Sequence, residues 1–136
     1  MGQPTIVTLE GVTQYVGKEA MAATLREVGE LCGDGSTIFV SYVDALYLSQ
    51  PSAVCGQGYA KPESLNLIPK MAARLGEPWI SYYTPPDMKA LLASCGFALA
   101  TDTTIADVNQ AYFGPVGREV PPEMMMMLER FAVAKK

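Results

Sequence analysis

The chain has 136 residues, a formal net charge of −4 and no histidine, and 49% of its residues are hydrophobic. This length favours a single domain, residues 1–136, with enough apolar side chains to bury a core. An acidic chain argues against binding to the phosphate backbone of nucleic acids. The lack of histidine removes the commonest metal ligand and the usual general base. We therefore expect no nucleic-acid partner and no metal site.

The three cysteines, Cys32, Cys55 and Cys95, lie far apart and form no CxxC pair. This spacing indicates buried, reduced thiols rather than a zinc site or a disulfide framework. No apolar run approaches the roughly 18 residues of a membrane span, and the N-terminus lacks the basic and apolar regions of a secretory signal. We therefore expect a cytoplasmic protein without a membrane partner.

Residues 5–9 form a short apolar, β-branched run that predicts a strand buried on both faces. The run ends at Glu10 and Gly11, and Tyr15 follows near the start of a predicted helix. Open α/β sheets bind their ligands at the carboxyl ends of such strands. The same three residues also suit a helix-start acid, a turn and a half-buried aromatic. One strand–turn–helix unit does not decide between these interpretations.

The next elements predict a strand–helix–strand unit. Residues 18–31 are predicted to be a helix because four apolar residues recur on one face, namely Met21, Leu25, Val28 and Cys32. Gly33 ends this helix, and residues 37–43 are nearly continuous in apolar and β-branched residues, which indicates a second buried strand. The two strands should be parallel. Because neither alternates with polar residues, helices should cover both faces of the sheet.

Residues 44–61 are irregular and contain Gly56-Gln57-Gly58, which is a weak nucleotide-loop motif because no strand precedes it. A mobile loop is the better interpretation, and its position after the second strand also suits a substrate lid. Residues 63–75 predict a helix with one apolar face made by Leu65, Ile68, Met71 or Ala72, and Leu75. Residues 77–83 predict a short extended link.

Thr84, Pro85 and Asp87 form a helix-start pattern, with a capping box closed by Asp87. The apolar stripe of this helix consists of Met88, Leu91, Leu92 and Cys95, and Gly96 ends it. Residues 97–103 predict a third strand, followed by a short helix from residue 104. The methionine-rich residues 124–128 favour packing over an exposed apolar surface. Residues 130–135 predict the last strand.

Four stretches carry motifs that occur in a fixed order along the chain. Residues 9–16 (LEGVTQYV) fit "EGV-x-x-YL", residues 35–40 (GSTIFV) fit a "GS-x-hydrophobic" strand, residues 76–79 (GEPW) fit "GePW", and residues 92–97 (LASCGF) fit "L-x-x-x-GF". This set resembles the leucine carboxyl methyltransferase-like family of S-adenosylmethionine (SAM)-dependent O-methyltransferases. The resemblance covers nearly the whole chain and corresponds to the C-terminal half of a family member.

The resemblance implies an α/β fold, namely a partial Rossmann-like methyltransferase sheet flanked by helices. About four strands are expected, mostly parallel, with the last inserted antiparallel before the third. It further implies SAM as cofactor, with Glu10 and Gly11 as cofactor-binding residues and Tyr15 and Trp79 as substrate-binding residues. Trp79 also suits a purely structural place at the edge of the core. The resemblance assigns no catalytic residue.

The glycine-rich cofactor loop and the ribose-binding acid of such folds have no counterpart in the chain. The predicted function is therefore the C-terminal portion of a SAM-dependent O-methyltransferase with a carboxylate or hydroxyl acceptor. We expect a homodimer, an element swap or a complementary N-terminal half to pair with the open edge of the first strand. One alternative is a non-enzymatic dimerising or small-molecule-binding module. Another is a complete small enzyme that shares one site across a dimer.

Overall fold

The computed structural model describes residues 2–50, 67–121, 124–125 and 128–136. The nucleotide-loop motif at residues 56–58 and Cys55 therefore lie outside the described residues.

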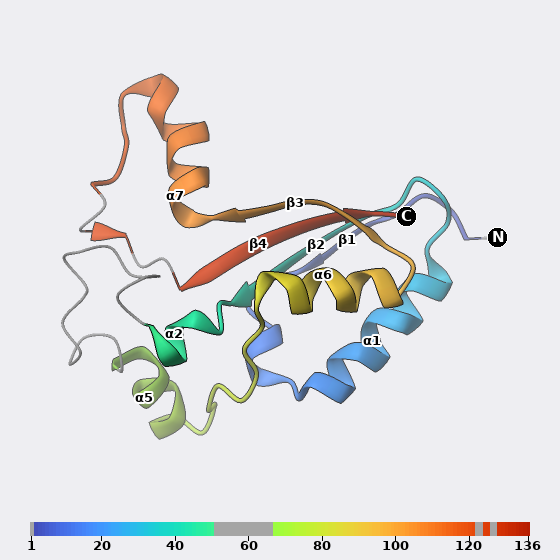
Figure 1. The fold of residues 1–136 in the computed structure, drawn as a ribbon, viewed down its shortest axis with the longest axis horizontal. Helices are drawn as coiled ribbons and strands as arrows, with labels where there is room; N and C mark the ends of the chain where they lie inside the picture. Colours follow the sequence, from blue (N-terminus) through green and yellow to red (C-terminus); the bar gives the residue numbers. More distant parts are fainter. Residues whose placement is uncertain (1, 51–66, 122–123, 126–127) are drawn as a thin grey trace.

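The described strands form one four-stranded sheet in the order β1-β2-β4-β3 (Figure 1). They are β1 (Ile6–Leu9), β2 (Thr37–Val43), β3 (Ala98–Thr104) and β4 (Glu129–Lys135). β1 pairs parallel with β2, whereas β4 runs antiparallel to both β2 and β3. The predicted α/β sheet is confirmed, including the last strand inserted antiparallel before the third. β1, β2 and β3 share one direction, so their carboxyl ends meet at one edge of the sheet.

Two helices, α1 (Lys18–Leu31) and α6 (Pro85–Ser94), lie together on one face of the sheet (Figure 1). Both begin where the sequence predicts, and the capping box of α6 is present. Their apolar stripes pack on β2 and form one buried cluster, which includes Met21, Leu25, Met88, Leu92, Ile38, Val40 and Tyr42. Burial of each such side chain contributes about 1.5–3 kcal/mol to folding, so this layer holds the sheet and helices together.

The two helices approach closely where Gly29 of α1 faces the C-terminal end of α6. A Cβ atom at Gly29 would lie only 2.2 Å from the backbone oxygen of Cys95. Glycine at this position therefore allows a helix contact that any larger residue would push apart. The thiols of Cys32 and Cys95 are buried and free, as the sequence predicts.

The opposite face of the sheet is less buried at β1 than the sequence predicted. The sequence predicted a β1 strand buried on both faces and helices on both sides of the sheet, but Ile6 is 81% exposed. Successive side chains of a strand point to opposite faces, so Val7 and Leu9 pack into the core while Ile6 and Thr8 point away. Among the described residues, no helix covers that opposite side of β1.

The remaining helices are short: α2 (Leu46–Ser49), α5 (Leu67–Arg74) and α7 (Ile105–Val108). α7 continues through a π-helical turn, Asn109–Phe113, and stands away from the end of β3 (Figure 1). The predicted helix over residues 63–75 is described only from residue 67. In it Ile68 packs against the Val43–Tyr47–Leu128 cluster.

Two predictions of buried side chains were wrong in part. Leu75, predicted on the inner face of its helix, is exposed. The reason is that α5 ends at Arg74 and the chain turns at Gly76, whose φ is +85°. In the methionine-rich segment Met125 is buried but Met124 is exposed, and residues 126 and 127 lie outside the described residues.

Candidate functional site

The turn after β1 is fixed to β2 by two hydrogen bonds. Gly11 has a φ of +65°, a backbone conformation that favours glycine. Its N–H donates to the Ser41 hydroxyl at 2.9 Å, and the Thr13 hydroxyl donates to the backbone oxygen of Ser41 at 2.9 Å. Thr13 is fully buried. The short 3-10 helix Thr13–Tyr15 is thereby held at the carboxyl edge of the sheet.

The link between α5 and α6 packs against this 3-10 helix. The backbone oxygen of Gln14 accepts hydrogen bonds from the N–H groups of Ile80, at 2.8 Å, and Ser81, at 3.2 Å. The Ser81 hydroxyl donates to the backbone oxygen of Val16 at 2.7 Å. These contacts bring residues 76–80 beside Tyr15, although the two segments are about 60 residues apart in the chain.

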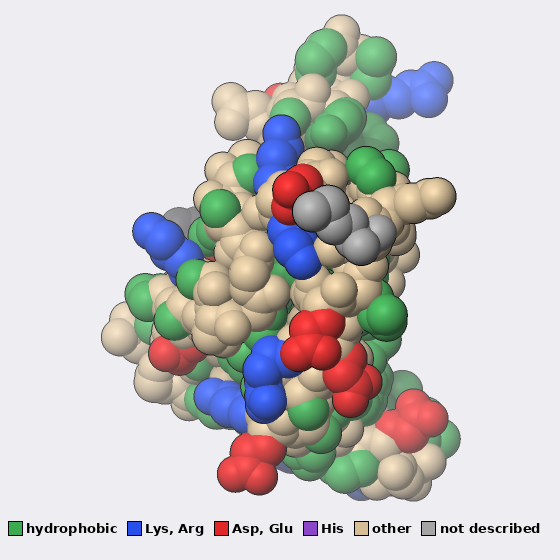
Figure 2. Space-filling model, turned by 90° about the vertical axis from the view of Figure 1, so that its right-hand side faces the viewer, with side chains coloured by type: hydrophobic (Ala, Val, Ile, Leu, Met, Phe, Trp, Pro, Cys, Tyr) green, Lys and Arg blue, Asp and Glu red, His purple; other side chains and the backbone are tan. Residues whose placement is uncertain are grey.

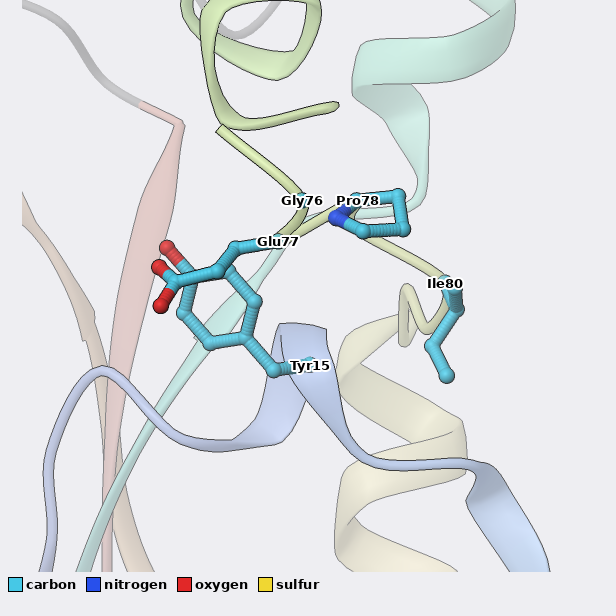
Figure 3. A pocket seen from close by; sticks show the side chains of 5 residues that line it. All are labelled: Tyr15, Gly76, Glu77, Pro78 and Ile80. Atoms are coloured by element: carbon cyan, nitrogen blue, oxygen red, sulfur yellow. The ribbon is translucent and has the colours of Figure 1, made fainter. Parts of the chain in front are cut away.

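A cavity of about 500 Å³ lies between these two segments. It is lined by Tyr15, Gly76, Glu77, Pro78 and Ile80 (Figure 3). The ring of Tyr15 and the carboxylate of Glu77 extend toward the same side in that view. Tyr15 is partly exposed, so its hydroxyl is accessible to a ligand. The structure therefore brings a hydrogen-bond donor and a carboxylate to the mouth of one pocket. The sequence assigned a binding role to Tyr15 but none to Glu77, although Glu77 lies in the GEPW motif.

Two carboxylates lie near each other at this edge of the sheet. Glu10 follows β1 directly, and Glu129 is the first residue of β4, paired in register with Val43 at the carboxyl end of β2. Burial and the neighbouring Glu10 carboxylate raise the pKa of Glu129 above its usual range. The sequence singled out Glu10 but missed Glu129, because the two are more than 100 residues apart and come together only through the pairing of β1 with β2 and of β2 with β4. Such a pair favours a cationic group nearby.

Trp79 stands between Pro78 and Ile80 in the chain but does not itself line this cavity. It packs against the second buried cluster, formed by Val43, Tyr47 and Leu128. Its indole Nε1 is buried and has no hydrogen-bond partner among the described residues. This is the core-edge position that the sequence allowed as an alternative, and a role in substrate binding stays a prediction.

A separate polar network joins β2, β3 and β4 on the face covered by the helices. Asp102 accepts hydrogen bonds from the Tyr42 hydroxyl at 2.5 Å and from Nε of Arg130 at 2.7 Å. Arg130 also pairs with the buried Asp44 at 3.6 Å. Burial and the Asp102 carboxylate raise the pKa of Tyr42 far above its usual value, so its hydroxyl stays protonated. All four side chains pair with one another, which indicates a structural role.

Acidic and basic side chains are interspersed on the side of the molecule that carries both chain termini (Figure 2). The C-terminal Lys136 donates from Nζ to the backbone oxygens of Gly29 and, at 2.8 Å, Cys32. It thus satisfies carbonyls at the C-terminal end of α1. The described residues contain no cluster of three or more metal-ligating side chains. None of their helices has the length and apolar character needed to cross a membrane.

No protein-family model and no curated protein matches the chain. Solved structures do. A DUF574 family protein from Streptomyces avermitilis shares 16% identity at a TM-score of 0.65, over 98% of this chain and 44% of that one. A putative methyltransferase from Thermobifida fusca shares 15% identity at a TM-score of 0.59, over 98% and 43%.

Magnesium protoporphyrin IX methyltransferase from Synechocystis, solved with bound S-adenosylhomocysteine (SAH), shares 13% identity at a TM-score of 0.52, over 100% and 46% of the two chains. These likenesses show that the chain has the fold of a part of SAM-type methyltransferases. The chain spans less than half the length of each of the three. The more specific leucine carboxyl methyltransferase-like assignment is not confirmed by them.

Proposed function

We propose that this chain is the C-terminal portion of a SAM-dependent O-methyltransferase and supplies the acceptor side of its active site. The observation that carries the proposal is the sheet order β1-β2-β4-β3 with its antiparallel β4, which aligns with methyltransferase structures over nearly the whole chain. The pocket beside Tyr15 lies at the carboxyl ends of parallel strands, where open α/β sheets bind ligands.

The described residues fit one side of a SAM site. Gly11 has no atom within 4 Å of the place where a Cβ would lie, so a ligand can approach its backbone closely. The exposed carboxylate of Glu10 favours a cation at the same edge. Glu10 and Gly11 would hold the cofactor, which supplies an electrophilic methyl group beside a positively charged sulfur. The glycine-rich loop of such folds has no counterpart here.

The acceptor pocket favours a hydroxyl group over a carboxylate. Glu77 lines the cavity with Tyr15, and its negative charge would repel an acceptor carboxylate. Toward a hydroxyl acceptor, Glu77 can accept the proton while the Tyr15 hydroxyl donates a hydrogen bond that orients the oxygen. Pro78 and Ile80 supply the apolar part of the pocket lining. Alignment of the two reactants is the main contribution required of the protein, because methyl transfer is a direct displacement.

The rest of the cofactor site must come from elsewhere. The chain spans less than half of the methyltransferase structures that it resembles, and we infer that a complementary N-terminal half, or a second copy of the chain, completes the site. The isolated chain should therefore bind SAH only at millimolar strength and transfer no methyl group.

Nuclear magnetic resonance titration of the chain with SAH tests this function. Chemical-shift changes are expected at the amides of Glu10, Gly11 and Tyr15, and Glu10→Ala should weaken binding roughly tenfold. Glu30→Ala is the matched control, because this exposed acid on α1 lies far from the carboxyl edge. Absence of shifts at these three amides with millimolar SAH would contradict the proposed cofactor contact.

A second candidate function is a non-enzymatic dimerising module. The specific observation in its favour is the apolar sheet face whose centre stays only half-buried, with Ile6 almost fully exposed. The two functions are compatible in that none of the residues lining the pocket beside Tyr15 lines the groove on that face.

A further inference from the structure

One face of the sheet carries apolar side chains at its centre, Phe39, Phe131 and Val133, that stay only half-buried, whereas Val43 at the carboxyl end of β2 is covered by α2 and α5. We call this face the open face. Its cross-strand neighbours follow from the register: Thr8 lies opposite Phe39, Phe39 opposite Val133, and Thr103 opposite Phe131. The rings of Phe39 and Phe131 stack at a centroid distance of 5.8 Å and an interplanar angle of 18°. The open face is therefore an ordered apolar surface.

A groove of about 520 Å³ runs along the open face. Its floor includes Phe39, Phe131 and Val133, and the segment after β3 forms one wall with Val108 and Tyr112. That segment stands away from the sheet (Figure 1), and Tyr112 is 73% exposed. Parallel α/β sheets normally have both faces covered, and exposed apolar patches of this kind mark interaction sites.

The charges at the two ends of the open face have opposite signs. Alternate residues of β4 point to this face, so the strand presents Glu129, Phe131, Val133 and Lys135 in that order. Asp107 adds a second acid to the groove. Neither Glu129 nor Lys135 forms an ion pair with any described residue. Along about 20 Å of β4 the open face therefore carries an acidic end at Glu129, an apolar centre and a basic end at Lys135.

This order makes the open face complementary to itself. A two-fold axis lying in the face and perpendicular to β4 reverses the strand direction in the second copy. Glu129 of one copy then faces Lys135 of the other, and the apolar centres of the two faces meet. An axis parallel to β4 would instead place Glu129 opposite Glu129 and Lys135 opposite Lys135. Such like-charge contacts disfavour association, so the charges select the first arrangement.

We propose that a second copy of this chain covers the open face and forms a two-fold symmetric dimer, with Glu129 of each copy paired to Lys135 of the other. Both pairs follow from one contact because a two-fold interface uses the same surface on each subunit. The two sheets pack face to face at about 10 Å, with strands aligned within about 30°. This partner does not depend on the proposed methyl transfer.

Sedimentation velocity of the purified chain, from about 1 to about 100 μM, measures the association. The wild-type chain is expected to dimerise. Glu129→Lys and Lys135→Glu should each weaken the dimer at least tenfold, because each places like charges opposite one another. An equimolar mixture of the two variants should restore the dimer as a heterodimer, since one ion pair then re-forms with reversed sign and the other keeps its original sense. Lys89→Glu, on the exposed side of α6, is the matched control and should have no effect.

Two results would overturn the proposal. A wild-type chain that stays monomeric at the highest concentration would show that a second copy does not cover the open face. A dimer that resists both charge reversals would show that the copies associate elsewhere, for example along the free edge of β1. Circular dichroism identifies variants that fail to fold. In that case Thr101→Arg, at an exposed position of the groove, replaces them and should weaken the dimer equally. SAH binding is measured separately, so the two proposals fail independently.

Discussion

The two faces of the sheet use similar side chains in different surroundings. On the covered face Ile38, Val40 and Ala132 are fully buried under α1 and α6. On the open face the neighbouring Phe39 and Phe131 stack on each other but stay only partly buried. Residues 38 and 39 are adjacent and both apolar. The difference between them comes from the helices that pack on one side, so a strand's hydrophobicity does not tell which of its faces is covered.

We expect the largest loss of stability from a substitution in the core of the covered face. Leu25→Ala removes a fully buried side chain of α1 and leaves a cavity against the sheet. We expect the free energy of unfolding to fall by about 2–5 kcal/mol, measured by urea denaturation with circular dichroism. Ile6→Ala, the exposed counterpart on the open face, should change it by about 0.5 kcal/mol or less. Equal losses from the two variants would show that the faces do not differ as described.

A second prediction tests the polar end of the covered face. Asp102→Asn keeps the size of the side chain but removes the charge that pairs with Arg130 and accepts from Tyr42. The loss of a charged acceptor in a half-buried network should lower the free energy of unfolding by about 1–3 kcal/mol. Urea denaturation measures it, with Asp34→Asn at an exposed turn as control. A wild-type value for Asp102→Asn would mean that the network does not stabilise the sheet.

A third prediction concerns the helix layer that covers one face. Alanine in place of glycine normally favours a helix by about 1 kcal/mol. At Gly29, however, the added Cβ would collide with the backbone oxygen of Cys95. Gly29→Ala should therefore lower the free energy of unfolding, by about 1–3 kcal/mol, and lower the melting temperature. Gly17→Ala has free space around its Cβ and should have a much smaller effect. An increase in stability at Gly29 would contradict the close approach of α1 and α6.

We expect the smallest effect from Glu129 on the open face, and it concerns how stability depends on pH. Because burial and Glu10 raise the pKa of Glu129 in the folded chain, the folded state holds this proton more strongly than the unfolded state. The contribution of Glu129 to stability is therefore fully present below the ordinary pKa of a glutamate and is lost as pH rises to the raised pKa. Glu129→Gln should remove this loss. The test is to measure the urea denaturation midpoints of the wild-type chain and of Glu129→Gln between pH 4 and pH 7, roughly the range in which a glutamate titrates. If the midpoints of the two chains depend on pH in the same way, the raised pKa of Glu129 is contradicted.

The sequence by itself determined most of the elements and one part of the candidate site. The bounds of α1 and β2 agree with the prediction, and Thr84 and Asp87 begin α6 as expected. These features are local, because they depend on apolar periodicity and on capping within a few residues. The placement of Glu10, Gly11 and Tyr15 after the first strand is local in the same way.

Only the tertiary structure decided which distant side chains meet. Glu77 joins Tyr15 through hydrogen bonds to the Gln14 backbone, and Glu129 approaches Glu10 because β4 pairs with β2. The open face is a tertiary property for the same reason, since it depends on where α1 and α6 pack rather than on the strands themselves. Local sequence encodes the period and the ends of each element. Strand register and helix packing, which join residues far apart in the chain, decide what each face and each pocket contains.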